Sequence, residues 1–323
     1  MRRREFIAGL GGAAAWPLTV RAQQRERVWR LGVLTPGVTV LEALRAIILP
    51  ELAKQGFVQG RNLVVDVKLG AVEALPQLAR ELAATAPDVI IAVGGGAIRA
   101  VLAATTTTPI VGAFIGEDPV AAGFAASLAR PGGTVTGVVM LAPELDAKRL
   151  DVLHDAVPGA SLIAALAVDA NRDAPNITAM QEQARRAGLQ LRTFYAAAPQ
   201  GFSAAFRSMS DAGVQAVAIV SAPELAGNAE TVAGLAIEAR LPTICEWPWM
   251  AKRGCLIGYG PIYAELHSRT ADYVSRILHG ASAGNLPMEQ PTHFSFTINT
   301  KTARSIGLEL PPGVLVRADE VIE

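Results

Sequence analysis

Short apolar runs alternate with amphipathic stretches along most of the chain. In the first half, this pattern predicts strands at 30–34, 62–68, 88–93, 109–114 and 135–139, with helices at 40–55, 75–84, 97–104 and 120–129. The strands are mostly apolar throughout, which is typical of a parallel sheet covered by helices on both faces. The first half therefore predicts one α/β lobe.

The same pattern starts again in the second half. It predicts helices at 144–156, 176–187, 202–212 and 228–239, and strands at 162–168, 189–195, 216–220, 242–245 and 255–259. A helix at 263–278 and a strand at 292–298 complete the sheets. Ligands of open α/β sheets bind beyond the carboxyl ends of the strands, so two facing sheets predict one shared cleft.

The first 22 residues predict an export signal. A basic start precedes a short apolar run rich in glycine and alanine, and small residues precede a cleavage point near Ala22. The segment Arg3-Arg4-Glu5-Phe6-Ile7 resembles the twin-arginine signature, with an ordinary Sec signal as the alternative. We therefore expect a periplasmic protein that is soluble after cleavage.

Charge and hydropathy exclude two kinds of partner. After removal of residues 1–22, 25 basic and 28 acidic side chains remain, and no basic block occurs beyond the first four residues. Nucleic acid is therefore not an expected partner. The body of the chain has no uncharged apolar segment of about 18 residues, so we expect no internal membrane span.

The sequence lacks the motifs that catalysis or metal binding requires. Gly94-Gly95-Gly96-Ala97 does not have the G-x-G-x-x-G spacing, a Walker A motif is absent, and no serine lies in a G-x-S-x-G elbow. The four histidines have no partner at metal-ligand or triad spacing: His154, His267, His279 and His293. We expect no enzymatic activity, no catalytic residue, no cofactor and no metal.

The two cysteines, Cys245 and Cys255, lie ten residues apart. An oxidising periplasm permits a disulfide, but the spacing alone does not fix the geometry that such a bond needs. Two small buried side chains are the alternative, and this is the one we expect.

Several segments carry a family resemblance. They are Phe57-Val-Gln-Gly-Arg-Asn-Leu-Val, Gly116-Glu-Asp-Pro-Val, Ser127-Leu-Ala-Arg-Pro-Gly-Gly-Thr-Val-Thr-Gly-Val, Gly258-Tyr-Gly-Pro, Ile298-Asn-Thr-Lys-Thr-Ala-Arg-Ser-Ile-Gly-Leu, Pro311-Pro and Arg317-Ala-Asp-Glu-Val-Ile. Together they resemble the periplasmic substrate-binding proteins of ABC-type transport systems, some of which look like tryptophan or tyrosine binders. The resemblance covers essentially the whole chain after the export signal.

This resemblance implies a type I periplasmic binding protein fold, with two Rossmann-like lobes, parallel sheets and a three-crossing hinge. We expect residues 28–140 and 262–288 to form the first lobe, and residues 141–261 and 289–323 to form the second. Three strand-end segments depart from the family's pattern, and we expect them to alter the ligand preference: Gly94-Gly95-Gly96, Asp169-Ala170-Asn171 and Ser221-Ala222-Pro223.

In the first lobe, the expected cleft residues are Thr35, Gly95, Gly96, Glu117 and Asp118. The two glycines fit either a tight turn into a helix or close approach of the backbone to a ligand carboxylate. Asp118 precedes Pro119 at the predicted helix start, which favours a capping role. For Glu117 we favour ligand contact.

In the second lobe, the expected cleft residues are Asp169, Asn171, Ser221, Glu224, Glu246 and Trp247. The acids favour a ligand with an ammonium group. Trp247, with Phe114, Tyr195 and Tyr259, either stacks on an aromatic ligand or packs within the protein. 

We therefore expect capture of a small organic solute and its delivery by a monomer to an ABC permease. An aromatic or branched-chain amino acid is the first candidate for the solute, and a purine or an aromatic acid is the next. A periplasmic sensor that presents its ligand to a membrane receptor or kinase is the alternative. The missing catalytic motifs disfavour an exported enzyme.

Overall fold

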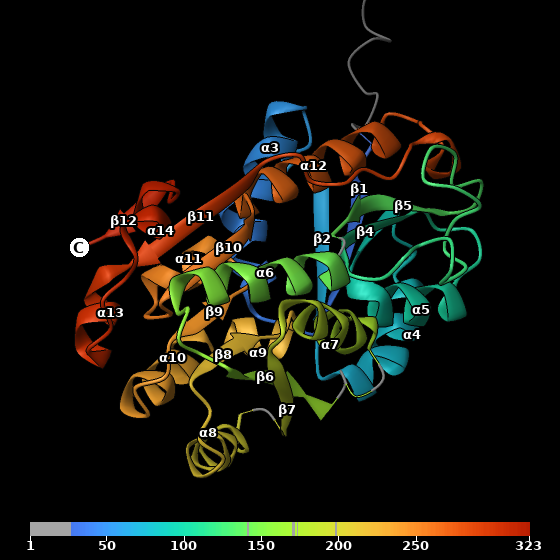
Figure 1. Ribbon diagram of the computed structural model, residues 1–323. Helices are drawn as coiled ribbons and strands as arrows, with labels where there is room; N and C mark the ends of the chain where they lie inside the picture. The colour runs from blue at the N-terminus through green and yellow to red at the C-terminus, as the bar shows by residue number, and fades with distance from the viewer. Residues whose placement is uncertain (1–26, 141, 170–171, 173, 198) are drawn as a thin grey trace, which may run out of the picture.

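The computed structural model describes residues 27–140, 142–169, 172, 174–197 and 199–323. The predicted export signal at 1–22 and the predicted ligand residue Asn171 lie outside these residues. Two β-sheets form the centres of two lobes, as Figure 1 shows.

The first lobe takes its strands from the N-terminal part of the chain and adds one long helix from the C-terminal part. Its strands are β1 (Trp29–Thr35), β2 (Leu63–Leu69), β3 (Val89–Val93), β4 (Ile110–Ile115) and β5 (Val135–Val139). Its helical elements are α2 (Thr39–Ala43), η2 (Leu44–Ile48), α3 (Leu49–Lys54), η3 (Val72–Ala74), α4 (Leu75–Ala84), α5 (Gly94–Ala104), α12 (Tyr263–Leu278) and η5 (Ala283–Asn285).

The second lobe holds the remaining elements. Its strands are β6 (Leu162–Val168), β7 (Gln190–Ala196), β8 (Ala216–Ile219), β9 (Thr243–Cys245), β10 (Ile257–Pro261), β11 (Phe294–Asn299) and β12 (Glu320–Ile322). Its helices are α6 (Ala142–Ala156), α7 (Pro175–Ala187), α8 (Phe202–Asp211), α9 (Pro223–Gly227), α10 (Ala229–Glu238), α11 (Pro248–Lys252), α13 (Thr300–Ile306) and α14 (Pro312–Val316).

Both sheets have the same strand order. The first runs β2-β1-β3-β4-β5 and is parallel throughout, and the second contains the equivalent order β7-β6-β8-β9-β10, extended by β11 and β12. Among the strands of the described residues, only β10 and β11 pair antiparallel. In this doubly wound order the strands are added to one side of β1 and of β6 and then to the other, and ligands of such sheets bind beyond the carboxyl ends of the strands. The predicted α/β fold with parallel sheets is confirmed.

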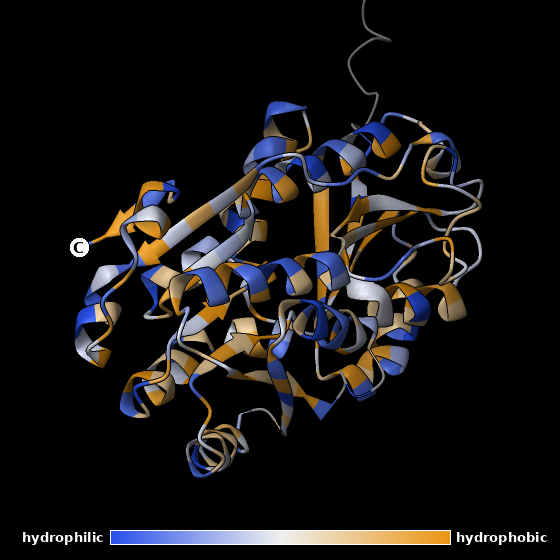
Figure 2. Cartoon of the chain, viewed as in Figure 1, coloured by the Kyte–Doolittle hydropathy of each residue, from blue (hydrophilic) through white to orange (hydrophobic). Residues whose placement is uncertain are grey.

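The chain passes between the lobes three times, after β5, after β10 and before β11. After the second passage, α12 packs against β3, β4 and β5 and lies beside α3 (Figure 1). In Figure 2, orange segments run along several strands of both sheets, and the helices carry blue hydrophilic residues beside apolar ones. Fully buried side chains such as Leu31, Ile91 and Leu166 account for the apolar runs in the sequence.

The predicted helix at 120–129 is wrong. The backbone N–H of Ala122 donates to the carbonyl of Asp118, which closes a single turn, and Gly123 then takes a φ of +74°. This left-handed conformation ends helical geometry, and the chain bends away. The glycines 94–96 also differ from a turn before a helix, because they form the first turn of α5 itself.

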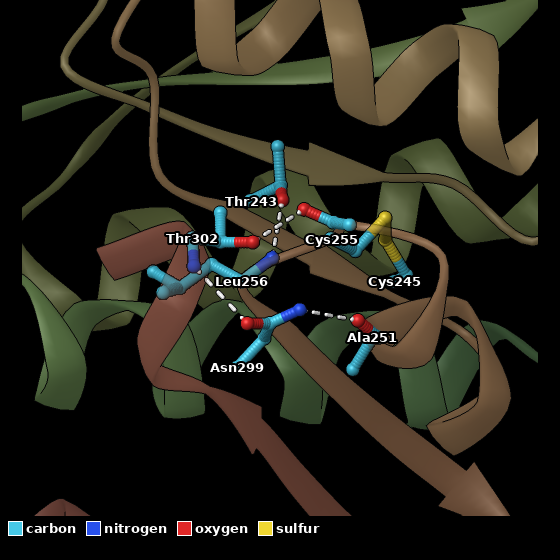
Figure 3. Close-up of a disulfide and its surroundings, with 8 residues drawn as sticks. Thr243, Cys245, Ala251, Cys255, Leu256, Asn299 and Thr302 are labelled. Carbon is cyan, nitrogen blue, oxygen red and sulfur yellow. Dashed lines mark hydrogen bonds between the residues drawn. A yellow bond between two sulfur atoms is a disulfide. The ribbon is translucent and has the colours of Figure 1, made fainter. Parts of the chain in front are cut away.

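The expectation of two free cysteines is also wrong, because Cys245 and Cys255 form a disulfide (Figure 3). The short helix α11 folds the intervening segment back, so that the two Cα atoms lie 6.7 Å apart. The Asn299 side chain donates to the Ala251 carbonyl and fixes the same segment from β11. Spacing could not show this pairing, since it depends on a five-residue helix that the hydrophobic pattern does not indicate.

Among the described residues, no helix combines the length and the apolar character that a membrane crossing needs.

Candidate functional site

A cavity of about 450 Å³ lies between the lobes. It sits at the carboxyl ends of β3 and β4 on one side and of β8 and β9 on the other. Its lining consists of Gly94, Gly95, Gly96, Arg99, Phe114, Gly116, Glu117, Met140, Ala142, Ala174, Pro175, Asn176, Ser221, Ala222, Pro223, Glu246 and Trp247. This position agrees with the ligand position expected for doubly wound sheets.

The structure brings six of the predicted ligand residues together in this cavity. These are Gly95, Gly96, Glu117, Ser221, Glu246 and Trp247. They come from both lobes, so a molecule in the cavity would touch both. Their contact with a ligand remains a prediction.

Four other predicted residues lie outside this lining. Thr35 is fully buried, and its hydroxyl closes a turn with the backbone of Gly37. Asp118 accepts from the backbone N–H of Val120 at 2.8 Å, so it caps the short turn and lines a neighbouring cavity. Asp169 forms an exposed ion pair with Arg172.

The fourth is Glu224, which lies in the first turn of the short helix α9, and its backbone carbonyl accepts from the Asn228 side-chain amide. Thr35 ends β1 and the other three positions follow a strand, but the side chains of Thr35 and Asp118 bond to the local backbone and that of Asp169 forms an exposed ion pair. Sequence position at a strand end therefore did not suffice to place a side chain in the cavity.

A buried polar network supports the second-lobe wall of the cavity. Arg149 is 1% exposed and donates to Asp146 at 2.5 Å, to the Ser221 hydroxyl at 2.9 Å and to the Tyr259 carbonyl at 2.7 Å. Asp146 also accepts from the Asn176 amide at 2.6 Å and from the Ser221 backbone. The network therefore fixes two cavity-lining residues, Asn176 and Ser221, through one buried ion pair.

Glu246 differs from the other acids of the site because it is buried without a cation of its own. No ion pair of the described residues includes its carboxylate, and Arg149 donates only to its backbone carbonyl, at 3.2 Å. The positive charge of Arg149 is already matched by Asp146. Burial raises the pKa of Glu246 to about 7, and Arg149 opposes this rise.

The opposite wall is the N-terminus of α5, which no side chain caps. Its first backbone N–H groups and the positive end of the helix dipole suit a negatively charged group. Glu117 lies over this turn and accepts from Arg99 at 2.9 Å. A Cβ atom added to Gly95 would lie 1.5 Å from Oε1 of Glu117, so this close approach requires glycine at position 95.

Gly95→Ala therefore provides a test of the role of Glu117. The alanine expels the carboxylate from α5, which weakens ligand binding, but the stability stays equal or rises by up to about 1 kcal/mol because alanine favours helix. The exposed Arg99–Glu117 ion pair contributes little to stability. Calorimetric titration and thermal denaturation check the two effects.

Gly96→Ala is the matched control, since its added Cβ meets only Leu75 at an ordinary 3.7 Å. If both alanine variants bind the ligand with native affinity, Glu117 does not contact the ligand.

Aromatic side chains from both lobes meet beside the cavity. Phe114 of β4 has a φ of +56°, and the β4–β5 register shifts between Gly112 and Ile115. This irregularity directs Phe114 toward the second lobe, where its ring lies 5.6 Å from that of Trp247. We call Phe114, Tyr263 and His267 of the first lobe, with Trp247 and Trp249 of the second, the aromatic junction.

Two glycines of β10 allow the segment with Glu246 and Trp247 to lie against the sheet. A Cβ atom at Gly260 would lie 2.0 Å from the Glu246 carbonyl, and one at Gly258 would lie 2.5 Å from the Trp247 carbonyl. The Gly258-Tyr259-Gly260-Pro261 motif is thus explained by backbone packing directly behind the cavity.

Among the residues that the sequence reasoning missed, five with a charged, amide or thioether side chain line or support the cavity: Arg99, Met140, Asp146, Arg149 and Asn176. Asp146 and Arg149 lie three residues apart within the predicted helix 144–156, a spacing that places them on one face. The sequence could not predict that this pair is buried, because exposed ion pairs on helices have the same spacing. The described residues contain no group of three or more side chains that could hold a metal ion.

Comparison with known proteins agrees with this geometry. A profile of the ABC transporter substrate binding protein family matches residues 40–322. A conserved domain protein from Vibrio cholerae is 25% identical, with a TM-score of 0.82 over 91% of this chain and all of that one. Among curated proteins, no match was found.

Two further solved structures share the fold. An ABC domain from Streptococcus pneumonia in complex with L-Trp is 22% identical, with a TM-score of 0.81 over 91% of this chain and all of that one. A ligand-free, open substrate binding protein with adhesive properties from Clostridium difficile is 21% identical, with a TM-score of 0.64, over 92% of this chain and 99% of that one. The neighbours support the two-lobed type I binding fold.

Proposed function

Because the chain belongs to the ABC transporter substrate binding protein family, we propose that it is the solute-binding component of an ABC importer and binds an amino acid. The family consists of solute-binding proteins, not of enzymes. In the proposed role, the solute binds between residues 28–140 with 262–288 and residues 141–261 with 289–323. Lobe closure about the three chain crossings then encloses it.

The observation that carries the amino-acid proposal is the charge arrangement of the cavity. The buried carboxylate of Glu246 has no ion pair of its own, so an ammonium group would supply the missing charge. The N-terminus of α5, to which no side chain hydrogen-bonds, lies on the opposite wall and suits a carboxylate, whereas Arg99 is already paired with Glu117 there. A zwitterion offers one group of the required charge to each wall.

An aromatic side chain is the best fit for the rest of the cavity. Phe114 and Trp247 line it, and both offer ring surface for stacking. The complex of the related Streptococcus domain with L-Trp supports an aromatic amino acid as the first candidate. In this proposal Ser221, Asn176 and the backbone N–H of Gly96, which an alanine at position 96 would keep, add the hydrogen bonds that fix its orientation.

The cellular part of the proposal follows from the predicted export signal. We place the protein in the periplasm as a monomer, after twin-arginine export and cleavage near Ala22, and we expect an inner-membrane permease to receive the solute from the closed lobes. 

A thermal-shift screen tests the function. The protein is unfolded and refolded to remove carried-over solute, then mixed with amino acids, aromatic acids, nucleobases and sugars. A ligand at about 100 times its Kd adds roughly 2.7 kcal/mol of stability, which gives a clear shift in Tm. Stabilisation by amino acids alone supports the proposal, whereas stabilisation only by sugars or nucleobases contradicts it.

Affinity for the amino acid should depend on pH through Glu246. An ammonium ligand needs the ionised carboxylate, whose pKa of about 7 lies above its ordinary value because the group is buried. We expect affinity to be constant above pH 7 and to fall by about tenfold per pH unit below it, because the proton must leave on binding. Calorimetric titration from pH 5 to 8.5 measures this dependence.

Glu246→Gln should bind more weakly and lose most of that pH dependence. The ligand-free protein should show the opposite trend in folding stability, which decreases as the pH rises from about 4.5 through 7 because the fold favours the protonated acid. Affinity that is independent of pH in the native protein would exclude Glu246 as the ammonium partner.

A further inference from the structure

Unpaired polar atoms concentrate at the aromatic junction. In the described part of the chain, seven buried side-chain polar atoms have no hydrogen-bond partner, and four of them lie here. They are the indole nitrogen of Trp249, the hydroxyl of Tyr263 and both ring nitrogens of His267. The Tyr263 ring centroid lies 6.2 Å from that of Trp249 and 4.4 Å from that of His267. Buried polar groups are normally paired, so this concentration calls for an explanation.

The junction is formed where the two lobes touch. Tyr263 is the first residue of α12, directly after the second chain crossing, and belongs to the first lobe. Trp249 lies on α11 of the second lobe. When the lobes separate, water regains access to the contact surface between them. In the structure, the polar atoms of Trp249 and Tyr263 are buried without a partner, so contact between the lobes leaves them without water.

The surroundings of these atoms are apolar enough to make this loss costly. Burial raises the pKa of Tyr263 to about 12 and lowers that of His267 to about 4, so both groups are neutral at physiological pH. Phe114, stacked on Tyr263 at 5.6 Å, is held at a positive φ that bulky side chains rarely adopt. The contact between the lobes thus combines ring packing, which favours closure, with unpaired groups and backbone strain, which oppose it.

We propose that the aromatic junction opposes lobe closure and so limits ligand affinity, with Tyr263 and Trp249 as the residues that lose water without gaining a partner. The inference rests on the lobe closure of the proposed function, but it does not depend on which solute binds. It predicts that removal of an unpaired polar atom favours the closed form. Tyr263→Phe removes one oxygen and keeps the stacked ring.

Distance measurement between the lobes in ligand-free protein tests the proposal. Nitroxide labels are attached through Gln77→Cys on α4 and Arg186→Cys on α7, two exposed positions in different lobes, while the native cysteines remain in their disulfide. Double electron–electron resonance then gives the ratio of short to long distances. We expect Tyr263→Phe to raise the closed-to-open ratio by about fivefold or more, which corresponds to the cost of one unpaired buried group.

Tyr195→Phe is the matched control, because Tyr195 lies on β7 outside the junction, and it should leave the ratio unchanged. A ratio that is unchanged or lower in Tyr263→Phe overturns the proposal. A lower ratio would mean that the hydroxyl is bonded in the closed form, with Thr39 as its neighbour. Since no solute is added, failure to find an amino-acid ligand would overturn the proposed function without affecting this result.

Discussion

Arg149→Met is expected to lower the free energy of unfolding by about 3–5 kcal/mol, since it leaves a buried charge without its partner. The substitution removes the cation from Asp146, which is 1% exposed, and removes the donors to Ser221 and to the Glu246 and Tyr259 carbonyls. Methionine fills much of the same volume, so the loss is mainly electrostatic. Chemical denaturation measures the change.

Two further variants separate this effect from a general intolerance of substitution. Arg317→Met breaks an exposed ion pair with Asp155 that has the same kind of geometry, 2.7 Å, and should cost less than about 1 kcal/mol. Asp146→Asn combined with Arg149→Met removes both charges and should recover part of the stability. A loss for Arg149→Met no larger than that for Arg317→Met would contradict the buried network.

Reduction of the Cys245–Cys255 disulfide is expected to lower the free energy of unfolding by about 2.5–3 kcal/mol. The bond closes a loop with a sequence separation of 10, and the constraint on the unfolded chain predicts a value of this size. Both sulfurs are fully buried, so the reductant must act on the unfolded chain. Urea denaturation with and without reductant, equilibrated through the unfolded state, measures the difference.

The double variant Cys245→Ala and Cys255→Ala is the control, and reductant should not change its denaturation midpoint. The same variant should also bind solute more weakly, because the closed loop carries Glu246 and Trp247 at the cavity. If the native protein has the same denaturation midpoint with and without reductant, the disulfide contributes nothing to folding stability.

The architecture was predictable because it depends on patterns that are local in sequence. The apolar runs at β3, β6 and β8 are buried on both faces, and α12 has the predicted bounds 263–278. The helix expected at 120–129 failed because Pro119 and the apolar spacing suggested a start, while Gly123 ended the turn after a few residues. A single residue in the left-handed conformation outweighed the periodicity.

For the cavity, the sequence could predict only which strand ends lie near it. Gly95, Glu117 and Glu246 line it because they follow β3, β4 and β9, but Asp169 follows β6 and forms an exposed ion pair with Arg172 instead. The network of Asp146 and Arg149 depends on packing between α6 and the ends of three strands, which spacing within a helix does not specify. Side-chain direction and long-range burial therefore required the structure.

The most direct test of the central claim compares L-tryptophan with indole-3-propionate, which lacks the amino group, by calorimetric titration at pH 8. If Glu246 binds the ammonium group, Glu246→Gln weakens L-tryptophan binding by about 10- to 100-fold, the value of a charge-assisted hydrogen bond, and barely changes indole-3-propionate binding. Equal losses for both compounds, or native affinity for L-tryptophan in the variant, would contradict the account.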